Sequence, residues 1–258
     1  MIGGNQGQVQ YAQGPIYQTD LFKPNAPSGS KWSTIGQATN KRLYHSGALL
    51  LESGHVVTVG SEFDNYDDFY NPQKSECFED VKAPHTGPKL GPGCTDPFNY
   101  NIERFTPPYL MKGPGPVITK APSTVTYGSL IEISVKSTAG IARATLIRYS
   151  SLTHSTNTDQ RFIELIIKGS KAAENKLYIS FPENSALAPP GNWMLFLLNE
   201  NGVPSTASSI MLKIGKPDIA NFVIVDPEPK TKPKTNDTPV ISWFGTFIAS
   251  ILSFFFLA

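Results

Sequence analysis

The sequence predicts an all-β protein, and three observations lead to that prediction. The 258 residues include 22 prolines and 21 glycines, which interrupt helices and favour turns. Aromatic residues, which favour strands, make up 11% of the chain. Apolar residues recur mainly in short alternating runs, and few windows show the longer period of a helix. The length allows one large domain or two ordinary ones.

The charge balance excludes one class of partner. The chain has 22 Lys and Arg residues against 21 Asp and Glu residues, a net charge of +1. Nucleic-acid binding relies on basic surfaces that neutralise phosphates. We therefore expect no nucleic-acid partner.

In the first half, short strands are expected around a Tyr-His pair. Residues 32–36 are expected to form a strand that leads towards it, and residues 47–51 and 55–60 are apolar runs. Residues 52–54, Glu-Ser-Gly, mark a turn between these two runs. The long segment 61–103 has no clear periodicity, which is typical of a functional or disordered loop.

The pair itself is Tyr44-His45. Neighbouring side chains in a strand point to opposite faces, so one site can use both only where the backbone twists or bulges. The alternative is that Tyr44 packs in a β core while His45 faces solvent. The residues alone leave both interpretations open.

The second half shows the cleanest alternation. Gly113-Pro114-Gly115-Pro116 marks a domain boundary, after which several runs of β-branched and aromatic residues follow, separated by turns. Such spacing over about a hundred residues is typical of a β-sandwich with its own core. The expected strands are residues 130–135, 144–149, 162–167, 176–181, 193–198 and 209–214.

A histidine lies between two of these strands. His154 falls in the segment 150–155, which we expect to be a loop beyond the end of a strand. From a loop tip a side chain can reach a neighbouring domain, which a core histidine cannot. The alternative is an ordinary hydrogen-bonded loop histidine.

The only two cysteines are Cys77 and Cys94, both in the long loop. In an oxidising compartment a disulfide between them would close that loop and offset part of its conformational entropy. In a cytosolic chain they would be two free thiols. We predict the disulfide, because the tail of the chain argues for secretion.

The tail is a linker followed by an apolar segment. Residues 216–239 are rich in Pro and Lys, which predicts an extended linker. Residues 240–258 carry no charge, are long enough to span a bilayer as a helix, and have no basic flank after them. A glycosylphosphatidylinositol (GPI) signal needs no such flank. It would use Asn236 as the attachment candidate, 239–246 as spacer and 247–258 as apolar tail. A retained membrane helix is the alternative.

Four ordered motifs give the chain a specific resemblance. Together they cover most of residues 1–215, and they are similar to the C-terminal part of the copper-radical oxidases, the galactose oxidase and glyoxal oxidase family. The resemblance is closer to the glyoxal oxidase branch. The motifs are residues 42–46, 103–110, 150–155 with 159–161, and 189–205.

The resemblance implies an architecture and a site. Residues 1–112 would be the last blades of a kelch-type β-propeller, and residues 113–215 an immunoglobulin-like early set domain. Tyr44 would be a copper ligand and the proton acceptor from substrate, with His45 and His154 as two imidazole ligands. Phenolate and imidazole donors suit Cu(II).

One departure from the family matters. The family's second redox group is a tyrosine linked to a cysteine, and both precede the Tyr-His motif, whereas Cys77 and Cys94 follow Tyr44. We therefore expect the chain to be an inactive fragment of a longer enzyme. The N-terminus also lacks a secretory signal, which a GPI-anchored protein needs upstream. Post-translational insertion of a tail-anchored chain is the alternative.

The function implied by the resemblance is an extracellular, cell-surface oxidase. It would oxidise simple aldehydes or alcohols with O₂ and release H₂O₂, and would be held at the membrane by the lipid anchor or the helix. The alternative is a non-catalytic cell-surface β protein that keeps the fold without the radical site.

Overall fold

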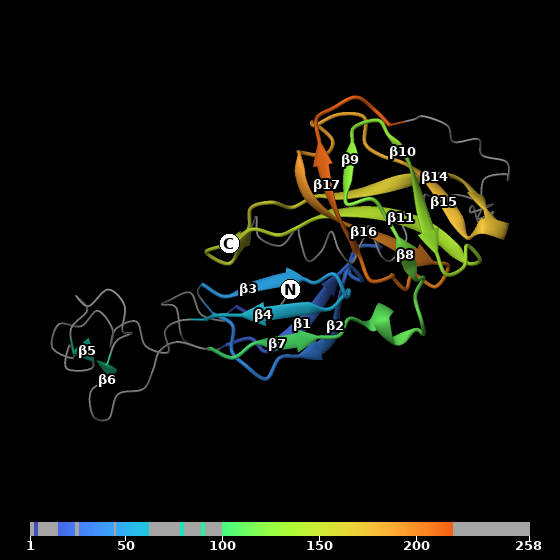
Figure 1. Cartoon of the computed structure of the whole chain (residues 1–258). Helices are drawn as coiled ribbons and strands as arrows, with labels where there is room; N and C mark the ends of the chain where they lie inside the picture. The colour runs from blue at the N-terminus through green and yellow to red at the C-terminus, as the bar shows by residue number, and fades with distance from the viewer. Residues whose placement is uncertain are drawn as a thin grey trace.

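The computed structural model describes residues 3–4, 15–23, 26–43, 45–61 and 100–218, together with the short strands β5 (Phe78–Glu79) and β6 (Lys89–Leu90). In these ranges the protein is almost entirely β, which confirms the predicted fold class (Figure 1). Tyr44, Cys77, Cys94, Asn236 and the tail from 219 lie outside the described residues. Within the described ranges, no helix is both long and apolar enough to cross a bilayer.

Eight strands form one curled sheet in the second half of the chain. Their order is β8-β10-β15-β14-β11-β16-β17-β9, and all neighbours are antiparallel except β17 and β9. The strands are β8 (Ile118–Lys120), β9 (Thr124–Thr126), β10 (Leu130–Val135), β11 (Ile141–Arg148), β14 (Phe162–Lys171), β15 (Lys176–Ser180), β16 (Gly191–Asn199) and β17 (Ser208–Lys213).

Strand β14 makes this sheet into a sandwich. Its first residues pair with β11 and its last residues pair with β15, with a shift in register between Ile167 and Gly169. A long strand that bends at such an irregularity can pass from one layer to the other. The two halves of the sheet therefore face each other across one apolar core.

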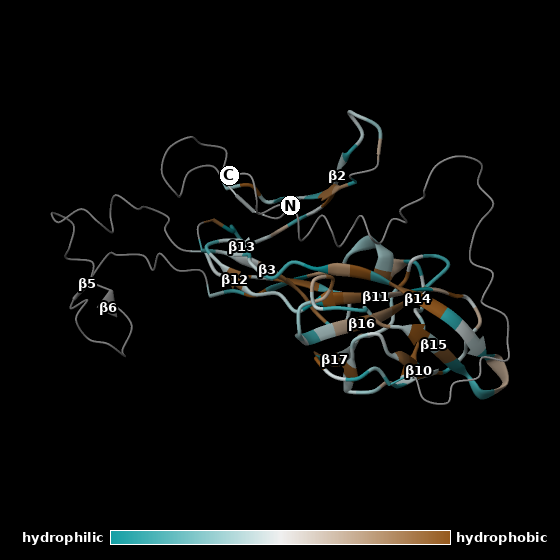
Figure 2. Cartoon of the chain, turned by 90° about the horizontal axis from the view of Figure 1, so that it is seen from above, coloured by the Kyte–Doolittle hydropathy of each residue, from teal (hydrophilic) through white to brown (hydrophobic). Residues whose placement is uncertain are grey.

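Strand β16 lies between β11 and β17, and its residues 193–198 are buried on both faces of the strand. Trp193, Leu195 and Leu197 point into the sandwich core, where they meet side chains such as Ile133 and Ile179 from the opposite layer. The alternate residues Met194, Phe196 and Leu198 are equally buried but belong to a second apolar cluster. Figure 2 shows apolar colouring on both β11 and β16.

The first half of the described chain contains three smaller sheets, one of which is the pair β5 and β6. Strands β1 (Gln18–Phe22) and β2 (Trp32–Gln37) pair with each other. Strands β3 (Gly47–Leu50), β4 (Val56–Val59) and β7 (Glu103–Phe105) form a three-stranded antiparallel sheet. The predicted turn at residues 52–54 connects β3 and β4, and Gly54 has a φ of +79°, a conformation that glycine adopts without strain.

The second apolar cluster joins the small sheets to the sandwich. It contains Leu50 and Val56 from β3 and β4, together with the alternate residues of β16. Tyr109, in the short 3₁₀ helix η2 (Pro108–Met111), packs in the same cluster and donates a hydrogen bond to the Gly54 carbonyl. Burial raises the pKa of Tyr109, so its hydroxyl remains a donor at all ordinary pH values. The two parts of the chain thus share a continuous core.

Candidate metal centre

The structure brings His45 and His154 together from distant parts of the chain. Their imidazole rings have centroids 4.8 Å apart and meet edge to face at 77°. Both side chains are exposed. His45 precedes β3 in one of the small sheets, whereas His154 belongs to an excursion from the sandwich. The pair therefore exists only because the two parts of the chain are packed together.

His45 lies in a turn rather than in a strand. Its φ of +57° is a left-handed conformation, which is uncommon for a residue that is not glycine. Ser46 donates from its backbone N–H to the Leu43 carbonyl at 3.2 Å, which closes this turn just before β3 begins. Gly60, with a φ of +73°, passes behind the turn, and a Cβ there would lie 2.9 Å from the His45 carbonyl oxygen. A larger residue at position 60 would push the turn outwards.

Arg42 anchors the chain that leads into this turn. Its side chain is 1% exposed and its guanidinium donates to the Thr58 hydroxyl at 3.2 Å, the Gly60 carbonyl at 2.7 Å and the Asn101 carbonyl at 2.8 Å. It also forms an ion pair with Glu103 at 3.4 Å. Burial lowers the pKa of Arg42, while the Glu103 carboxylate opposes that shift. The guanidinium thus ties β4, β7 and the histidine turn together.

Glu103 completes the anchor from the other side. It accepts hydrogen bonds from the Thr39 backbone N–H at 2.6 Å, the Thr39 hydroxyl at 2.7 Å and the Asn40 backbone N–H at 3.2 Å. Burial alone would raise the pKa of Glu103, but the hydrogen bonds from Thr39 and Asn40 outweigh it and leave the pKa lowered. The segment before His45 is therefore fixed at both its backbone and its side chains.

His154 lies at the tip of a tight β-hairpin. Strands β12 (Leu152–Thr153) and β13 (Thr156–Asn157) pair in antiparallel fashion, with Thr153 opposite Thr156. The two residues between them, His154 and Ser155, have φ values of +51° and +60°. Positive φ at both central residues is the pattern of a type I′ hairpin turn, which normally selects Asn-Gly or similar pairs. The predicted loop is therefore a strained hairpin.

The base of the hairpin is held by polar contacts. Asn157 is 3% exposed, and its side chain bonds the Ser151 and Asp159 backbone N–H groups and the Ser150 hydroxyl. Asp159 accepts a hydrogen bond at 2.9 Å from Arg148. The excursion thus leaves and rejoins the sandwich at a fixed position.

The hairpin also packs directly on β3. Leu152 lies against Gly47, where a Cβ on the glycine would come within 2.7 Å of the leucine Cδ1. Figure 2 shows β12 and β13 beside β3. This contact places the hairpin tip over the turn that carries His45.

The ring of His154 has a further partner within the hairpin. The Thr153 hydroxyl lies 2.6 Å from His154 Nδ1, which is hydrogen-bond distance. His45 and His154 each have further interactions within the fold.

The separation of the two rings is close to that expected for two imidazole ligands of one metal ion. With metal–nitrogen bonds of about 2.0–2.1 Å, two imidazoles bound at a right angle would have ring centroids about 4.5 Å apart. The observed separation is 4.8 Å. Among the described residues, no group of three or more His, Cys, Asp and Glu side chains gathers around a common point. Any third ligand here must come from another residue type or from outside the described ranges, as a ligand from Tyr44 would.

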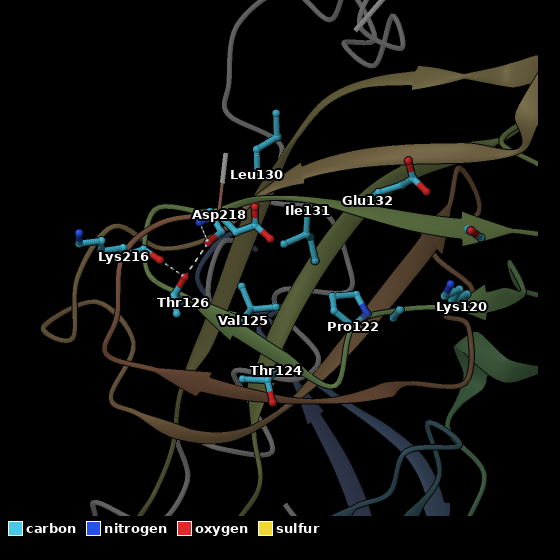
Figure 3. A pocket seen from close by; sticks show the side chains of 13 residues that line it. Lys120, Pro122, Thr124, Val125, Thr126, Leu130, Ile131, Glu132, Lys216 and Asp218 are labelled. Atoms are coloured by element: carbon cyan, nitrogen blue, oxygen red, sulfur yellow. Dashed lines mark hydrogen bonds between the residues drawn. The ribbon is translucent and has the colours of Figure 1, made fainter. Parts of the chain in front are cut away.

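A separate cavity occurs on the sandwich. It has a volume of about 430 Å³ and lies between β9 and β10, with Val125, Ile131, Lys120 and Asp218 among its lining residues (Figure 3). None of its lining residues belongs to the segments that carry His45 or His154. The cavity is not part of the histidine site.

Residues 115–212 match the family described as Galactose oxidase-like, Early set domain. The second half of the described chain is therefore such a domain, and the match lies within the predicted range 113–215. The predicted resemblance to the galactose oxidase and glyoxal oxidase family, a family of copper oxidases, is confirmed.

Whole-sequence comparisons extend the similarity across the small sheets. Galactose oxidase of Gibberella zeae is 30% identical over 215 residues, which cover 81% of this chain and 27% of that protein. Aldehyde oxidase GLOX of Vitis pseudoreticulata is 28% identical over 218 residues, covering 81% of this chain and 37% of that protein. A solved fungal alcohol oxidase in complex with copper has a TM-score of 0.60 and 27% identity, covering 83% of this chain and 39% of that one. The chain thus spans roughly a quarter to two fifths of these relatives.

Sequence reasoning found both histidines but missed the residues that position them. Thr153 directly precedes His154, and Arg42 lies two residues before Tyr44, so both fall within the family motifs. A hydroxyl beside a candidate ligand histidine is a signal that could have been used, because ligand histidines usually hydrogen-bond through their second nitrogen. Asn157 gave no such signal, since its role depends on how the hairpin folds.

Proposed function

We propose that this chain is part of an extracellular copper-radical oxidase of the glyoxal oxidase type. The enzyme would oxidise simple aldehydes or alcohols with O₂ and release H₂O₂. The observation that carries the proposal is the convergence of His45 and His154, whose rings lie 4.8 Å apart. Relatives named galactose oxidase and aldehyde oxidase, and a solved copper-bound alcohol oxidase, support the same chemistry.

The reaction balances as a two-electron oxidation by O₂. An alcohol RCH₂OH and O₂ give RCHO and H₂O₂, and an aldehyde with water and O₂ gives RCOOH and H₂O₂. Copper, when bound, supplies one-electron redox chemistry and a positive centre that favours the deprotonated substrate oxygen.

The residues of this chain would bind the metal and move the proton. His45 and His154 would hold copper through imidazole nitrogen, as their spacing allows. Tyr44, adjacent to His45 in the sequence, would provide a phenolate ligand and accept the substrate's hydroxyl proton. Its role rests on the family resemblance.

A second redox group is required for two-electron chemistry at a single copper. In this family it is a tyrosine linked to a cysteine, and both residues precede the Tyr-His motif. Within residues 1–43 there is no cysteine. We therefore propose that the 258-residue chain holds the ligand half of the site and does not turn over substrate by itself.

We also propose that two of the small sheets are the last blades of a kelch-type propeller. Each contains antiparallel strands, β1-β2 and β3-β4-β7, and the second packs on the early set domain through the shared apolar cluster. In this interpretation residues 1–112 belong to the propeller, and the histidine hairpin reaches from residues 113–215 onto its surface.

One observation favours a second candidate function. Both histidines are exposed, and among the described residues no third His, Cys, Asp or Glu joins them. A non-catalytic cell-surface β protein that retains the hairpin as structure would show the same arrangement. The two functions differ in whether the pair binds copper.

Copper binding by the full chain tests the proposal. We expect Cu(II) to bind with nitrogen hyperfine structure in the electron paramagnetic resonance (EPR) spectrum. His45→Gln or His154→Gln should weaken binding by more than the ~10–100-fold that is typical of losing a partner of a ligand. His55→Gln is the matched control, because His55 follows β3 and bonds the Ser53 hydroxyl at 3.0 Å but stands outside the pair. Equal affinity in all four proteins would favour the non-catalytic function.

The extracellular location leads to two further expectations. Cys77 and Cys94 would be joined in a disulfide, so thiol labelling of the unreduced protein should modify neither. A GPI anchor at Asn236 would make the protein releasable from membranes by phospholipase. Recovery of an intact peptide from residues 247–258 would instead show a retained membrane helix.

A further inference from the structure

We propose that Thr153 is a positioning residue for the metal site. Its hydroxyl holds the His154 ring in the tautomer that leaves Nε2 available to copper. This inference rests on the proposed function, because it assigns the atom through which His154 binds. The hydroxyl of Thr153 would accept a hydrogen bond from Nδ1–H, at the observed separation of 2.6 Å.

The chemistry of imidazole sets the argument. A neutral ring carries one N–H and one lone pair, so a hydrogen bond to one nitrogen decides the state of the other. If Nδ1–H donates to the threonine oxygen, Nε2 bears the lone pair and can bind a metal. Ligand histidines in proteins commonly donate their second N–H in this way, which fixes both the tautomer and the ring orientation.

The hairpin makes Thr153 a rigid acceptor. Thr153 is the last residue of β12 and pairs with Thr156 across the ladder, so its backbone is fixed immediately before the turn. A β-branched side chain also has few χ1 rotamers. The hydroxyl is therefore held beside the ring of the next residue, whose own backbone is constrained at a φ of +51°.

The first test uses the metal-free full chain labelled with [¹⁵N]histidine. The sequence has only 4 histidines, so the imidazole nitrogens give few signals, and His154→Gln assigns the one of interest. We expect the neutral His154 ring to be mainly the Nδ1–H tautomer. Thr153→Val, which keeps the shape and removes the hydroxyl, should shift it towards Nε2–H, and Thr153→Ser should restore Nδ1–H.

The second test measures Cu(II) affinity by competition with a chelator of known affinity. Loss of a partner that orients a ligand typically weakens metal binding by about 10–100-fold, which is the effect expected for Thr153→Val. Thr153→Ser should bind within about threefold of the parent. Thr156→Val is the matched control, because Thr156 lies opposite Thr153 on the same hairpin and its hydroxyl donates to the His154 backbone oxygen, at 3.4 Å.

The outcomes separate this inference from the proposed function. A wild-type His154 ring in the Nε2–H form would overturn the inference, and this needs no variant to fold. Unchanged copper affinity in Thr153→Val would also overturn it. If the parent binds copper no better than His45→Gln, the proposed function fails, while the tautomer measurement still decides what Thr153 does to the ring.

Discussion

Strand β16 and the β12–β13 hairpin belong to the same domain but differ in burial and in backbone strain. Residues 193–198 of β16 are fully buried on both faces of the strand. At the hairpin tip, His154 is exposed, and it and Ser155 both have positive φ. Uncommon backbone conformations cost about 1–3 kcal/mol each and persist only where the surroundings enforce them. The stable sandwich can thus support a strained tip, and the strain is located at the candidate site.

The largest expected effect comes from breaking the core that links the two parts. Phe196→Ala removes a fully buried ring from the cluster between β16 and the small sheets, and should lower the free energy of unfolding by about 3–5 kcal/mol. Denaturant unfolding of the full chain measures this. Ile166→Ala, at a side chain that is 58% exposed on β14, is the control and should change stability by less than about 0.5 kcal/mol.

The second apolar cluster marks the limit of what could be predicted from sequence. The six strands expected in the second half all occur, because alternation of apolar and polar residues reports which side of a strand is buried. Burial of Met194 and Phe196 on the second face was not predictable, since it depends on packing against β3 and β4. A continuous apolar run carries no information about which neighbour covers each face.

The sequence predicted that His45 and His154 come together, but it did not predict the backbone conformation of either residue. Both histidines were proposed, and the structure brings them together. His45 lies in a turn directly before β3, and the loop expected at residues 150–155 is a hairpin whose two central residues have positive φ. His-Ser is not one of the residue pairs that favour such a turn, so the local sequence does not predict it. The sequence favoured the glyoxal oxidase branch, whereas identities of 30% and 28% do not separate the branches.

The anchor beneath His45 should give the next largest effect. Arg42→Met keeps much of the side-chain volume but leaves the Gly60 and Asn101 carbonyls without their charged donor. We expect a loss of about 2–3 kcal/mol in unfolding free energy, because buried acceptors are left without partners. Lys112→Met, at a side chain that reaches the Asn201 carbonyl from an exposed position, is the control and should cost under about 1 kcal/mol. An equal loss in both variants would show that Arg42 is not a special anchor.

The carboxylate in that anchor predicts a pH dependence. The folded pKa of Glu103 lies below its usual range, so its contribution is present above the unfolded pKa of about 4.3 and is lost as pH falls through the folded pKa. Glu103→Gln should cost about 1 kcal/mol near neutral pH and almost nothing in strong acid. Unfolding of both proteins at several pH values provides the comparison. A parallel pair of stability curves would contradict this role for Glu103.

The smallest effect has the opposite sign and tests the strain directly. Ser155→Gly places the residue best suited to positive φ at the second position of the hairpin turn, where φ is +60°. The relieved strain of about 1–2 kcal/mol is partly offset by the greater freedom of glycine in the unfolded chain, so we expect a net gain of up to about 1 kcal/mol. Asn175→Gly is the matched control, since Asn175 has a φ of +54° far from the site and asparagine already tolerates this region, so its gain should be smaller.

Cu(II) affinity of Ser155→Gly should stay within about threefold of the parent, because His154 and its Thr153 partner are unchanged. A loss of stability in Ser155→Gly would mean that the turn is not strained and that the contrast between hairpin and core has another origin.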